Sequence, residues 1–545
     1  MIFIQNINII PKPVKTKISN GKFVLTDNTI ILTRKNLLNI GEYLKNLILP
    51  STGFNLKFKE LNEITAFNEK SINLQLLEDK NKHNFEKYFL SITPKNINIS
   101  ATTPNGIFYG IQTIRQLFPP EIESDNIIEN VEWKIPCLDV EDFPRFSWRG
   151  YMLDEARYFY GKDEVKQLLD LMALFKMNTF HWHLTDDQGW RIEIKKYPKL
   201  TEIGSKREES QIGGYFSKKK DGIPHLGYYS KEDIQEIIIY AKERFITIMP
   251  EIDMPGHTRA ALASYPNLSC KGYDFKVSPH WGIHKDVFCI GKEEVFEFAQ
   301  DVLNEIMDLF PSKIIHIGGD EVLKTRWENC PECQLRIESE VLKDEKELQI
   351  YFTNRVTSFL ASNKRKVIVW NDIIEDGLDK NIICQFWFPS SMKIHIEKIQ
   401  SRKVVMSNYE YVYLDRPYIF TSLKKAYNYE PMVKKLKEEY QSQVLGLEAC
   451  MWGELVPNTK ILEFQTFPRL IAFAETGWSP KSKKNFTSFQ QRLKYILQRL
   501  DIKNIKYAKN NVAQPKLFKK FSHLFSFWKE KLIVSNIKAV HRKKI

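Results

Sequence analysis

The sequence predicts an α/β protein whose main domain is a closed (β/α)8 TIM barrel, preceded by a small α+β domain. From Trp148 onward, short apolar runs alternate with longer stretches of helical periodicity. Eight such runs occur within roughly 340 residues, the number that closes a barrel. An open doubly wound sheet would place a glycine-rich phosphate loop after its first strand, and this chain has none there.

Composition limits the class of protein. The 545 residues are 43% hydrophobic, 27% charged and 13% aromatic, which is ordinary for a folded chain and argues against disorder. Such a length predicts more than one domain. An uninterrupted run of about 18 apolar residues is missing, so the sequence predicts no membrane span.

The first unit, residues 1–118, has short strand-like runs and two helical stretches, which predict an α+β domain. Pro119-Pro120 and the acidic stretch after them predict a linker over 119–145, with the barrel over 146–509 and an extension over 510–545. The expected strands of the first unit are Lys22–Leu25, Thr29–Leu32, Ile72–Leu76 and Ile97–Ser100, and its expected helices are Leu37–Leu49 and Gly106–Leu117.

Eight runs are expected to form the barrel, with helices such as Lys162–Phe175, Lys231–Arg244 and Glu293–Leu309 between them. The runs are Gly150–Leu153, Thr179–Leu184, Ile246–Ile252, Ile314–Ile317, Val367–Trp370, Ile382–Trp387, Val404–Ser407 and Val444–Cys450.

The charge of +13 is concentrated at the end of the chain. Residues 515–545 hold nine Lys or Arg against one acid, and their apolar residues recur at helical spacing. This pattern predicts a basic amphipathic helix that packs on its own domain or makes weak contact with an anionic surface. No nucleic-acid motif is present. The start of the chain does not resemble a signal peptide, so a cytoplasmic protein is expected, or a periplasmic or secreted one if a leader has been removed.

The seven cysteines do not form a disulfide framework. Cys330 and Cys333 make one C-x-x-C, which is weak evidence for zinc because a second pair at suitable spacing is missing. Cys270 and Cys289 could close a loop in an oxidising compartment. The sequence therefore predicts neither a metal nor a cofactor.

Polar residues follow nearly every expected barrel strand, and a barrel brings the carboxyl ends of its strands to one face. The strand of Ile314–Ile317 ends in two glycines and the adjacent acids Asp320 and Glu321. Two carboxylates this close raise the pKa of one of them, so that an acid stands beside a base at neutral pH. Trp370, Trp387 and Trp452 also lie at strand ends, where indole rings can stack on the C–H faces of sugars.

These motifs resemble those of the family 20 glycoside hydrolases, the β-N-acetylhexosaminidases. The resemblance covers about residues 1–505. It rests on His316-Ile-Gly-Gly-Asp-Glu-Val322, Trp148-Arg-Gly-Tyr-Met-Leu-Asp154 with Ala156-Arg157, Phe180-His-Trp-His-Leu-Thr-Asp-Asp187, Pro250-Glu-Ile-Asp-Met-Pro-Gly-His257, Tyr413-Leu-Asp415 and Trp452-Gly-Glu454.

The resemblance implies an exo-acting retaining enzyme that removes terminal β-linked GlcNAc, and in some members GalNAc, from oligosaccharides or glycoconjugates. The 2-acetamido group of the substrate acts as the nucleophile and forms an oxazolinium ion, an exception to the usual pair of carboxylates. Glu321 is then the general acid/base, Asp320 the partner of the acetamido group and Tyr413 a hydrogen-bond donor to it. The substrate-binding residues implied are Arg149, Asp186, His257, Trp370, Trp387, Asp415, Trp452 and Glu454.

Three alternatives remain open on the sequence. A disaccharide-releasing, lacto-N-biosidase-like member would share these motifs. His181-x-His183 at a strand end is similar to the zinc ligands of amidohydrolase barrels. A sugar-binding protein without catalysis is the third.

Overall fold

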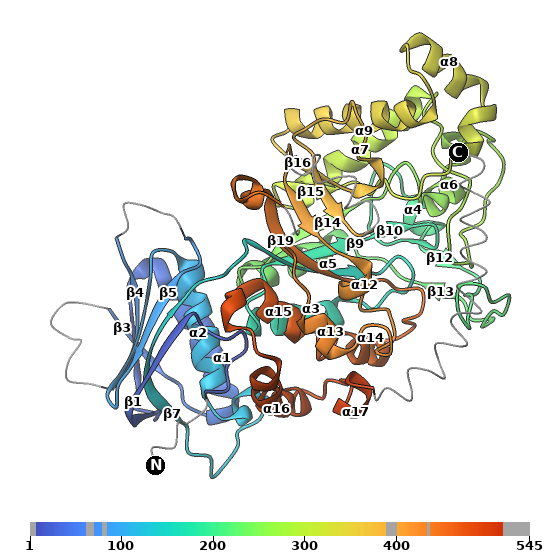
Figure 1. Cartoon of the computed structure of the whole chain (residues 1–545). Helices are drawn as coiled ribbons and strands as arrows, with labels where there is room; N and C mark the ends of the chain where they lie inside the picture. The colour runs from blue at the N-terminus through green and yellow to red at the C-terminus, as the bar shows by residue number, and fades with distance from the viewer. Residues whose placement is uncertain (1–6, 61–69, 79–83, 389–400, 433–435, 516–545) are drawn as a thin grey trace.

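The computed structural model describes residues 7–60, 70–78, 84–388, 401–432 and 436–515. It has an amino-terminal α+β domain beside a larger barrel domain (Figure 1). The predicted amphipathic helix over 515–545 falls almost entirely outside the described residues. No described helix has both the length and the apolar composition that a membrane span requires.

The first domain is built on one mixed sheet in the order β1-β7-β5-β6-β4-β2-β3. Helices α1 (Leu38–Thr52) and α2 (Pro104–Leu117) lie between this sheet and the barrel (Figure 1). Nearly every residue of α2 is buried, because its two sides meet the sheet and the barrel. The strands are β1 (Lys15–Val24), β2 (Ile30–Thr33), β3 (Lys57–Glu60), β4 (Ser71–Leu76), β5 (Tyr88–Ile92), β6 (Asn96–Ala101) and β7 (Lys134–Asp142).

The predicted linker over 119–145 is wrong. Strand β7 lies within that range and pairs antiparallel with both β1 and β5, so it is a central strand of the first sheet. The first domain therefore extends to Asp142, and the boundary predicted at residue 118 marks only a turn after α2. Proline and glycine signals report local breaks in structure, whereas long-range strand pairing decides where a domain ends.

The barrel closes as predicted, in the order β8-β9-β14-β15-β16-β17-β18-β19 with β19 pairing back to β8, and every pair is parallel. Each of the eight predicted runs forms one of these strands. They are β8 (Trp148–Asp154), β9 (Thr179–His183), β14 (Thr247–Glu251), β15 (Ile314–His316), β16 (Lys366–Trp370), β17 (Ile383–Phe386), β18 (Val404–Met406) and β19 (Val444–Met451).

The helices and short strands between and after these strands cover the outside of the barrel. The longest excursions follow β9, β14 and β15. The helices are α3 (Lys162–Leu174), α4 (Lys199–Glu202), α5 (Lys231–Lys242), α6 (Arg259–Ser264), α7 (Glu293–Leu309), α8 (Pro331–Ser339), α9 (Glu345–Ser362), α12 (Tyr409–Val412), α13 (Leu423–Tyr427), α14 (Thr459–Thr466), α15 (Arg469–Trp478), α16 (Phe486–Ile502) and α17 (Asn510–Ala513), and the short strands are β10 (Thr185–Asp186), β11 (Gly189–Trp190), β12 (Lys206–Arg207) and β13 (His225–Leu226).

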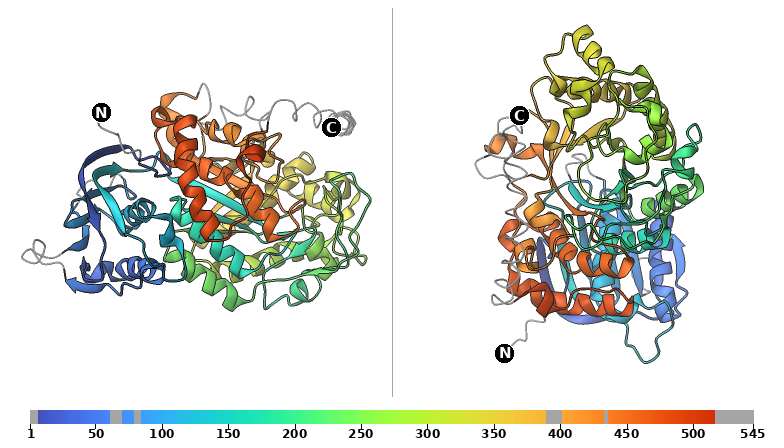
Figure 2. Two further views of the ribbon diagram at one scale, coloured as in Figure 1. Left: turned by 90° about the horizontal axis from the view of Figure 1, so that it is seen from below. Right: turned by 90° about the vertical axis from the view of Figure 1, so that its right-hand side faces the viewer.

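The two domains are joined by buried polar contacts. Figure 2 shows the carboxy-terminal helices beside the first domain, although the two are far apart in sequence. Arg499 of α16 donates to the carbonyl oxygens of Gln116 and Phe118 at the end of α2. Its guanidinium also pairs with Glu123. These contacts fix the barrel and the first domain as one packed unit.

Candidate active site

The loop after β15 places two carboxylates at the carboxyl end of the barrel. Gly318 and Gly319 adopt left-handed φ angles of 64° and 94°, and Glu321 has a φ of 50°. A Cβ atom on Gly318 would lie 1.7 Å from Oδ1 of Asp253, so glycine is required there. The backbone N–H of Gly319 donates to the same carboxylate oxygen at 3.1 Å. This tight turn presents Asp320 and Glu321 on the face where barrel enzymes hold their active sites.

His257 joins the two carboxylates to a second acidic pair. Its Nε2 atom lies 3.7 Å from Oδ2 of Asp320 and 3.9 Å from Oε2 of Glu321. On the other side of the ring, Nδ1 lies 3.2 Å from Oδ1 of Asp186 and 3.2 Å from Oδ2 of Asp187. Burial acts to lower the pKa of His257, but Asp186 and Asp320 raise it well above its ordinary value. The ring is therefore protonated, and this imidazolium lies between two pairs of carboxylates.

Asp320 has an unusual pKa for a carboxyl group. Burial raises the pKa of Asp320 to about 7; His257 opposes this rise, and the nearby carboxylates of Asp372 and Glu321 add to it. The side chain of Asp320 is 13% exposed, whereas that of Glu321 is 33% exposed. The two adjacent carboxyl groups therefore stand in different surroundings, and the more buried one, Asp320, has a raised pKa.

Arg157 is the second cation of this face. Its guanidinium lies 2.7 Å from Asp186 and 3.0 Å from Asp154, and its Nε donates to Gln188 at 2.8 Å. The guanidinium also lies 3.9 Å from the Glu454 carboxylate. Burial raises the pKa of Glu454, and Arg157 acts to lower that pKa. Arg157 therefore links β8, the turn after β9 and the loop after β19.

An aromatic wall faces the two carboxylates. The rings of Trp370 and Trp452 lie 5.6 Å apart, and Tyr413 lies 6.1 Å from Trp452. Trp387 stacks on Tyr413 at 6.3 Å with an angle of 18° between the rings. Burial raises the pKa of Tyr413 well above its ordinary value, so its hydroxyl remains a donor at neutral pH. Trp370 ends β16, Trp387 and Trp452 directly follow β17 and β19, and Tyr413 directly follows α12.

Two further acids lie at the edge of this wall. Burial raises the pKa of Asp415 to about 7, and the nearby carboxylate of Glu454 adds to the rise.

Tyr215, from the loop between β12 and β13, is 45% exposed. Desolvation, followed by the carboxylates of Glu454 and Asp415, raises the pKa of its hydroxyl well above the ordinary value. Tyr215 therefore lies near the carboxylates of Glu454 and Asp415.

Comparison with known proteins decides the family. The catalytic-domain model of glycosyl hydrolase family 20 matches residues 146–481, and the model of domain 2 of that family matches residues 6–143. The chain belongs to glycosyl hydrolase family 20. The two family-20 matches meet between the end of β7 and the start of β8, in agreement with the domain boundary seen in the structure.

Relatives named as hexosaminidases cover most of this family-20 chain. A β-hexosaminidase of Porphyromonas gingivalis is 37% identical over 515 residues, which make up 92% of this chain and 64% of that protein. One of Akkermansia muciniphila is 35% identical over 78% of this chain and 87% of its own length. The chain therefore spans a little less than two thirds of the first relative.

Solved structures agree with the sequence relatives. The exo-β-N-acetylglucosaminidase of Vibrio harveyi, solved with N-acetylglucosamine, is 29% identical with a TM-score of 0.81, over 93% of this chain and 79% of that one. A β-N-acetylhexosaminidase of Bacteroides fragilis is 30% identical with a TM-score of 0.77, over 92% of this chain and 96% of that one.

Most residues that the sequence analysis selected meet at this face of the family-20 barrel, and Arg149 does not. Arg149 stands near the start of β8 and is 1% exposed. Its guanidinium pairs with Glu86 at 2.7 Å and donates to the carbonyl oxygens of Lys176 and Phe146. The prediction that Arg149 binds substrate is wrong, because strand side chains alternate between the barrel interior and the helices. Those that meet are Asp186, His257, Asp320, Glu321, Trp370, Trp387, Tyr413, Asp415, Trp452 and Glu454.

Arg157 is the residue that sequence reasoning should have selected. It follows Asp154, the last residue of β8, by three positions, so its place after a strand end was visible in the sequence. Asp372 follows β16 in the same way and accepts a hydrogen bond from Nε1 of Trp387. Tyr215 gave no such signal, because its loop reaches the site only through the tertiary fold.

The family assignment excludes the amidohydrolase alternative. The geometry explains why His181-x-His183 is similar to the zinc ligands of those barrels. His181 and His183 both face the barrel interior. His181 lies 3.0 Å from Glu251 and 2.7 Å from Glu448, while His183 contacts Glu251 and Asp186. Burial opposes protonation, but Glu448 and Glu251 raise the pKa of His181 to about 9. His181 thus forms charge-assisted contacts with two buried glutamates of the barrel interior.

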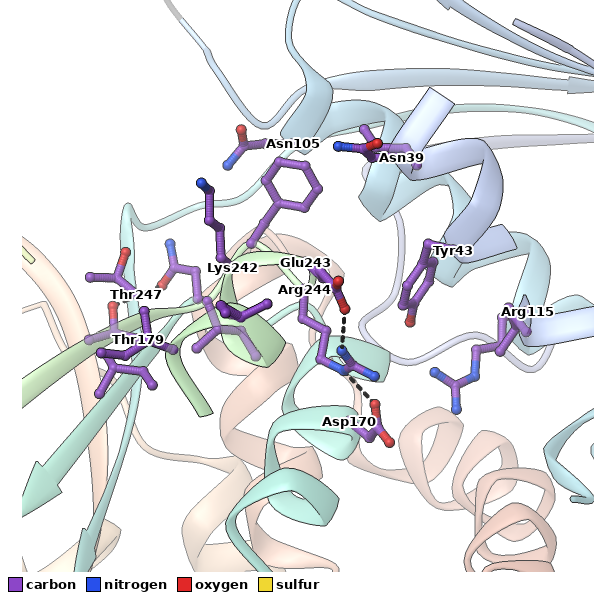
Figure 3. Close-up of a pocket in the computed structure, with 18 of the residues that line it drawn as sticks. Asn39, Tyr43, Asn105, Arg115, Asp170, Thr179, Lys242, Glu243, Arg244 and Thr247 are labelled. Carbon is purple, nitrogen blue, oxygen red and sulfur yellow. Dashed lines mark hydrogen bonds and ion pairs between the residues drawn. The ribbon is translucent and has the colours of Figure 1, made fainter. Parts of the chain in front are cut away.

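A large cavity at the other end of the barrel is a different kind of site. It has a volume of about 1470 Å³ and lies between α1, α5 and the starts of the barrel strands (Figure 3). Arg244 pairs with Asp170 at 2.6 Å and with Glu243 at 3.6 Å within it. These charges are paired with one another, which is typical of a domain interface.

Proposed function

We propose that this protein is an exo-acting retaining β-N-acetylhexosaminidase that hydrolyses terminal β-linked GlcNAc by substrate-assisted catalysis. The observation that carries the proposal is the placement of two adjacent carboxylates on one side of an aromatic wall. Asp320 and Glu321 both approach Nε2 of His257 within 4 Å. Two acids that work from opposite faces of a sugar would be separated across the site instead.

Glu321 is the proposed general acid and base. Its side chain is the more exposed of the pair, so it can reach the glycosidic oxygen of a bound substrate. It would protonate that oxygen as the acetamido oxygen attacks C1, and then accept a proton from the water that opens the oxazolinium ion. Two displacements at C1 retain the β configuration. General acid–base catalysis of this kind contributes about 10²–10⁴-fold.

Asp320 and Tyr413 would hold the acetamido group. An ionised Asp320 accepts a hydrogen bond from the acetamido N–H and stabilises the positive charge of the oxazolinium ion. That hydrogen bond favours the ionised carboxylate, so substrate binding would lower the pKa of Asp320 from about 7. The Tyr413 hydroxyl, which stays protonated, would donate to the acetamido oxygen. The rings of Trp370, Trp387 and Trp452 would enclose the methyl group.

Arg157 takes the role first assigned to Arg149. Together with Glu454 and Asp415 it would bind the ring hydroxyls of a terminal sugar. Its guanidinium already lies 3.9 Å from Glu454, and Glu454 raises the pKa of Asp415. Oδ1 of Asp415 and Oε2 of Glu454 have no hydrogen-bond partner among the described residues, and substrate hydroxyls would supply one to each. The names of the hexosaminidase relatives support the same substrate class.

The test is release of nitrophenol from the β-GlcNAc, β-GalNAc and β-glucose nitrophenyl glycosides. We expect cleavage of the N-acetyl sugars and none of the glucoside, because glucose lacks the nucleophile. Proton NMR of the first-formed sugar should show the β anomer. Equal turnover of the glucoside, or a first-formed α anomer, would contradict substrate assistance with retention. Absence of any cleavage would favour the disaccharide-releasing or the sugar-binding alternative.

A further inference from the structure

Four cysteines gather at one point outside the candidate active site. The Sγ atoms of Cys270, Cys289, Cys330 and Cys333 all lie within 4.8 Å of one another. Cys289, Cys330 and Cys333 are almost fully buried, and Cys270 is half-buried. The sequence shows one C-x-x-C without a second pair, but the fold brings up Cys270 and Cys289, which lie 63 residues before Cys333 and 41 residues before Cys330, respectively.

The sulfur spacings fit a tetrahedral metal and do not fit disulfides. The distances are 3.8 Å for Cys270–Cys333, 3.6 Å for Cys289–Cys330 and 3.6 Å for Cys289–Cys333. Zinc–sulfur bonds of about 2.3 Å in a tetrahedron separate the sulfurs by about 3.8 Å. A disulfide requires about 2.05 Å. Cys289 is equally close to Cys330 and Cys333, which a pairwise bond does not explain.

The backbone around the cluster is shaped to bring the sulfurs together. Ser269 and Phe288 form an antiparallel bridge, which brings the segments that carry Cys270 and Cys289 together. Cys330 is the N-cap of α8, and Cys333 stands in its first turn. A Cβ atom on Gly291 would lie 2.2 Å from the backbone of Glu332, so glycine is needed for this close approach.

We propose that these four cysteines bind one Zn²⁺ ion in a closed, structural site. Four thiolates complete the tetrahedral coordination of zinc and leave no position for a reacting water. The helix N-terminus of α8 offsets part of the negative charge of the thiolates. The Glu332 carboxylate lies 3.7 Å from Sγ of Cys289, and its charge is paired with the ammonium of Lys292 at 3.7 Å.

The site would clamp two loops that carry catalytic candidates. Cys270 and Cys289 belong to the loop after β14, which holds His257, and Cys330 and Cys333 belong to the loop after β15, which holds Glu321. Between the cluster and the carboxylates, Nε1 of Trp327 donates to the carbonyl oxygen of Phe288 at 2.8 Å. The backbone N–H of Phe288 donates to the carbonyl oxygen of Pro255, two residues before His257. The metal would therefore stabilise the base of the site without touching substrate.

The first experiment measures zinc in the full chain, purified without an affinity tag. We expect about one zinc per chain by elemental analysis, released by a mercurial reagent that reacts with thiolates. Cobalt reconstitution should give sulfur-to-cobalt charge-transfer bands and tetrahedral d–d absorption. Zinc-free protein with seven free thiols, disulfides within the cluster by mass spectrometry, or a cobalt spectrum without sulfur bands would each overturn the proposal.

Variants make the test specific. Cys289→Ser and Cys333→Ser should lose the zinc and show a lower thermal midpoint that added zinc does not restore. Cys137→Ala is the matched control, because Cys137 is buried in β7 far from the cluster, and it should keep the zinc. If the serine variants do not fold, the zinc content and mercurial release of the unaltered chain still decide the question. Loss of zinc from Cys137→Ala would contradict the assignment.

Discussion

Buried charges are arranged in opposite ways at the two ends of the barrel. Toward the first domain, described buried ions form pairs: Arg149 pairs with Glu86, Lys176 with Asp142 and Arg115 with Glu123. Burial acts to raise the pKa of Glu123, but Arg115 lowers it to about 2. At the carboxyl end, Arg157 and His257 face a larger group of acids, and the pKa values of Asp320 and Asp415 rise to about 7.

The difference distinguishes charges that stabilise the fold from charges that belong to the candidate active site. Paired ions at the amino-terminal end satisfy one another and fix the domain interface, so breaking a pair lowers stability. Excess carboxylates at the carboxyl end cost stability in the free protein, and under the proposed function a bound substrate would supply hydrogen bonds to them. The cavity of about 1470 Å³ lies at the amino-terminal end, among the paired charges, and no candidate active-site residue is among the described residues that line it.

The largest expected effect is loss of turnover at the carboxyl end. Glu321→Gln should fold normally and lower kcat by about 10²–10⁴-fold, because the amide cannot exchange a proton. Glu328→Gln makes the same change at an exposed position of the same loop and should leave kcat unaltered. Steady-state kinetics on the nitrophenyl β-GlcNAc glycoside measure both. Turnover of Glu321→Gln equal to that of the unaltered chain would remove this residue from the mechanism.

One substitution made at both ends tests the comparison directly. Arg149→Lys loses the bidentate pair with Glu86 and should lower the free energy of unfolding by about 1–3 kcal/mol with kcat/KM unchanged. Arg157→Lys should lower kcat/KM by about 10–100-fold, because an ammonium cannot bridge Asp186, Asp154 and sugar hydroxyls. Urea unfolding and kinetics on the same two proteins would show the roles reversed if the assignment were mistaken.

The raised pKa of Asp320 predicts a dependence of stability on pH. The folded protein holds this proton more tightly than the unfolded chain, so its contribution to stability is greatest below about pH 3.9 and is lost as pH rises through about 7. Asp320→Asn should therefore stabilise the protein by about 2–3 kcal/mol more at pH 8 than at pH 5. Unfolding midpoints at the two pH values measure this, and an equal difference at both would refute it.

The smallest effect concerns Asp372. This exposed carboxylate raises the pKa of Asp320, so Asp372→Asn should move the acid limb of kcat/KM to lower pH by less than about one unit. The shift should shrink in high salt, because screening weakens an exposed charge. Asp376→Asn, on the same loop, is the matched control and should leave the limb in place. A limb that stays fixed in Asp372→Asn would show that burial alone sets the pKa of Asp320.

The sequence predicted the parts of this protein that depend on local pattern. All eight barrel strands follow from apolar runs, and the carboxylates after β15 follow from their place beyond two glycines. Strands β3, β5 and β7 were missed. Strand β7 was assigned to a linker because it lies after Pro119-Pro120, and its partners β1 and β5 are distant in sequence.

Residue chemistry and order along the chain thus determined the fold class, the family and the residues at strand ends, because a barrel converts strand order into a single face. Tertiary structure decided what depends on direction and distance. It turned Arg149 toward the first domain, brought Tyr215 to the site and assembled four cysteines from two loops. Side-chain direction and contacts between loops are set by packing across the whole molecule, and a linear pattern does not encode them locally.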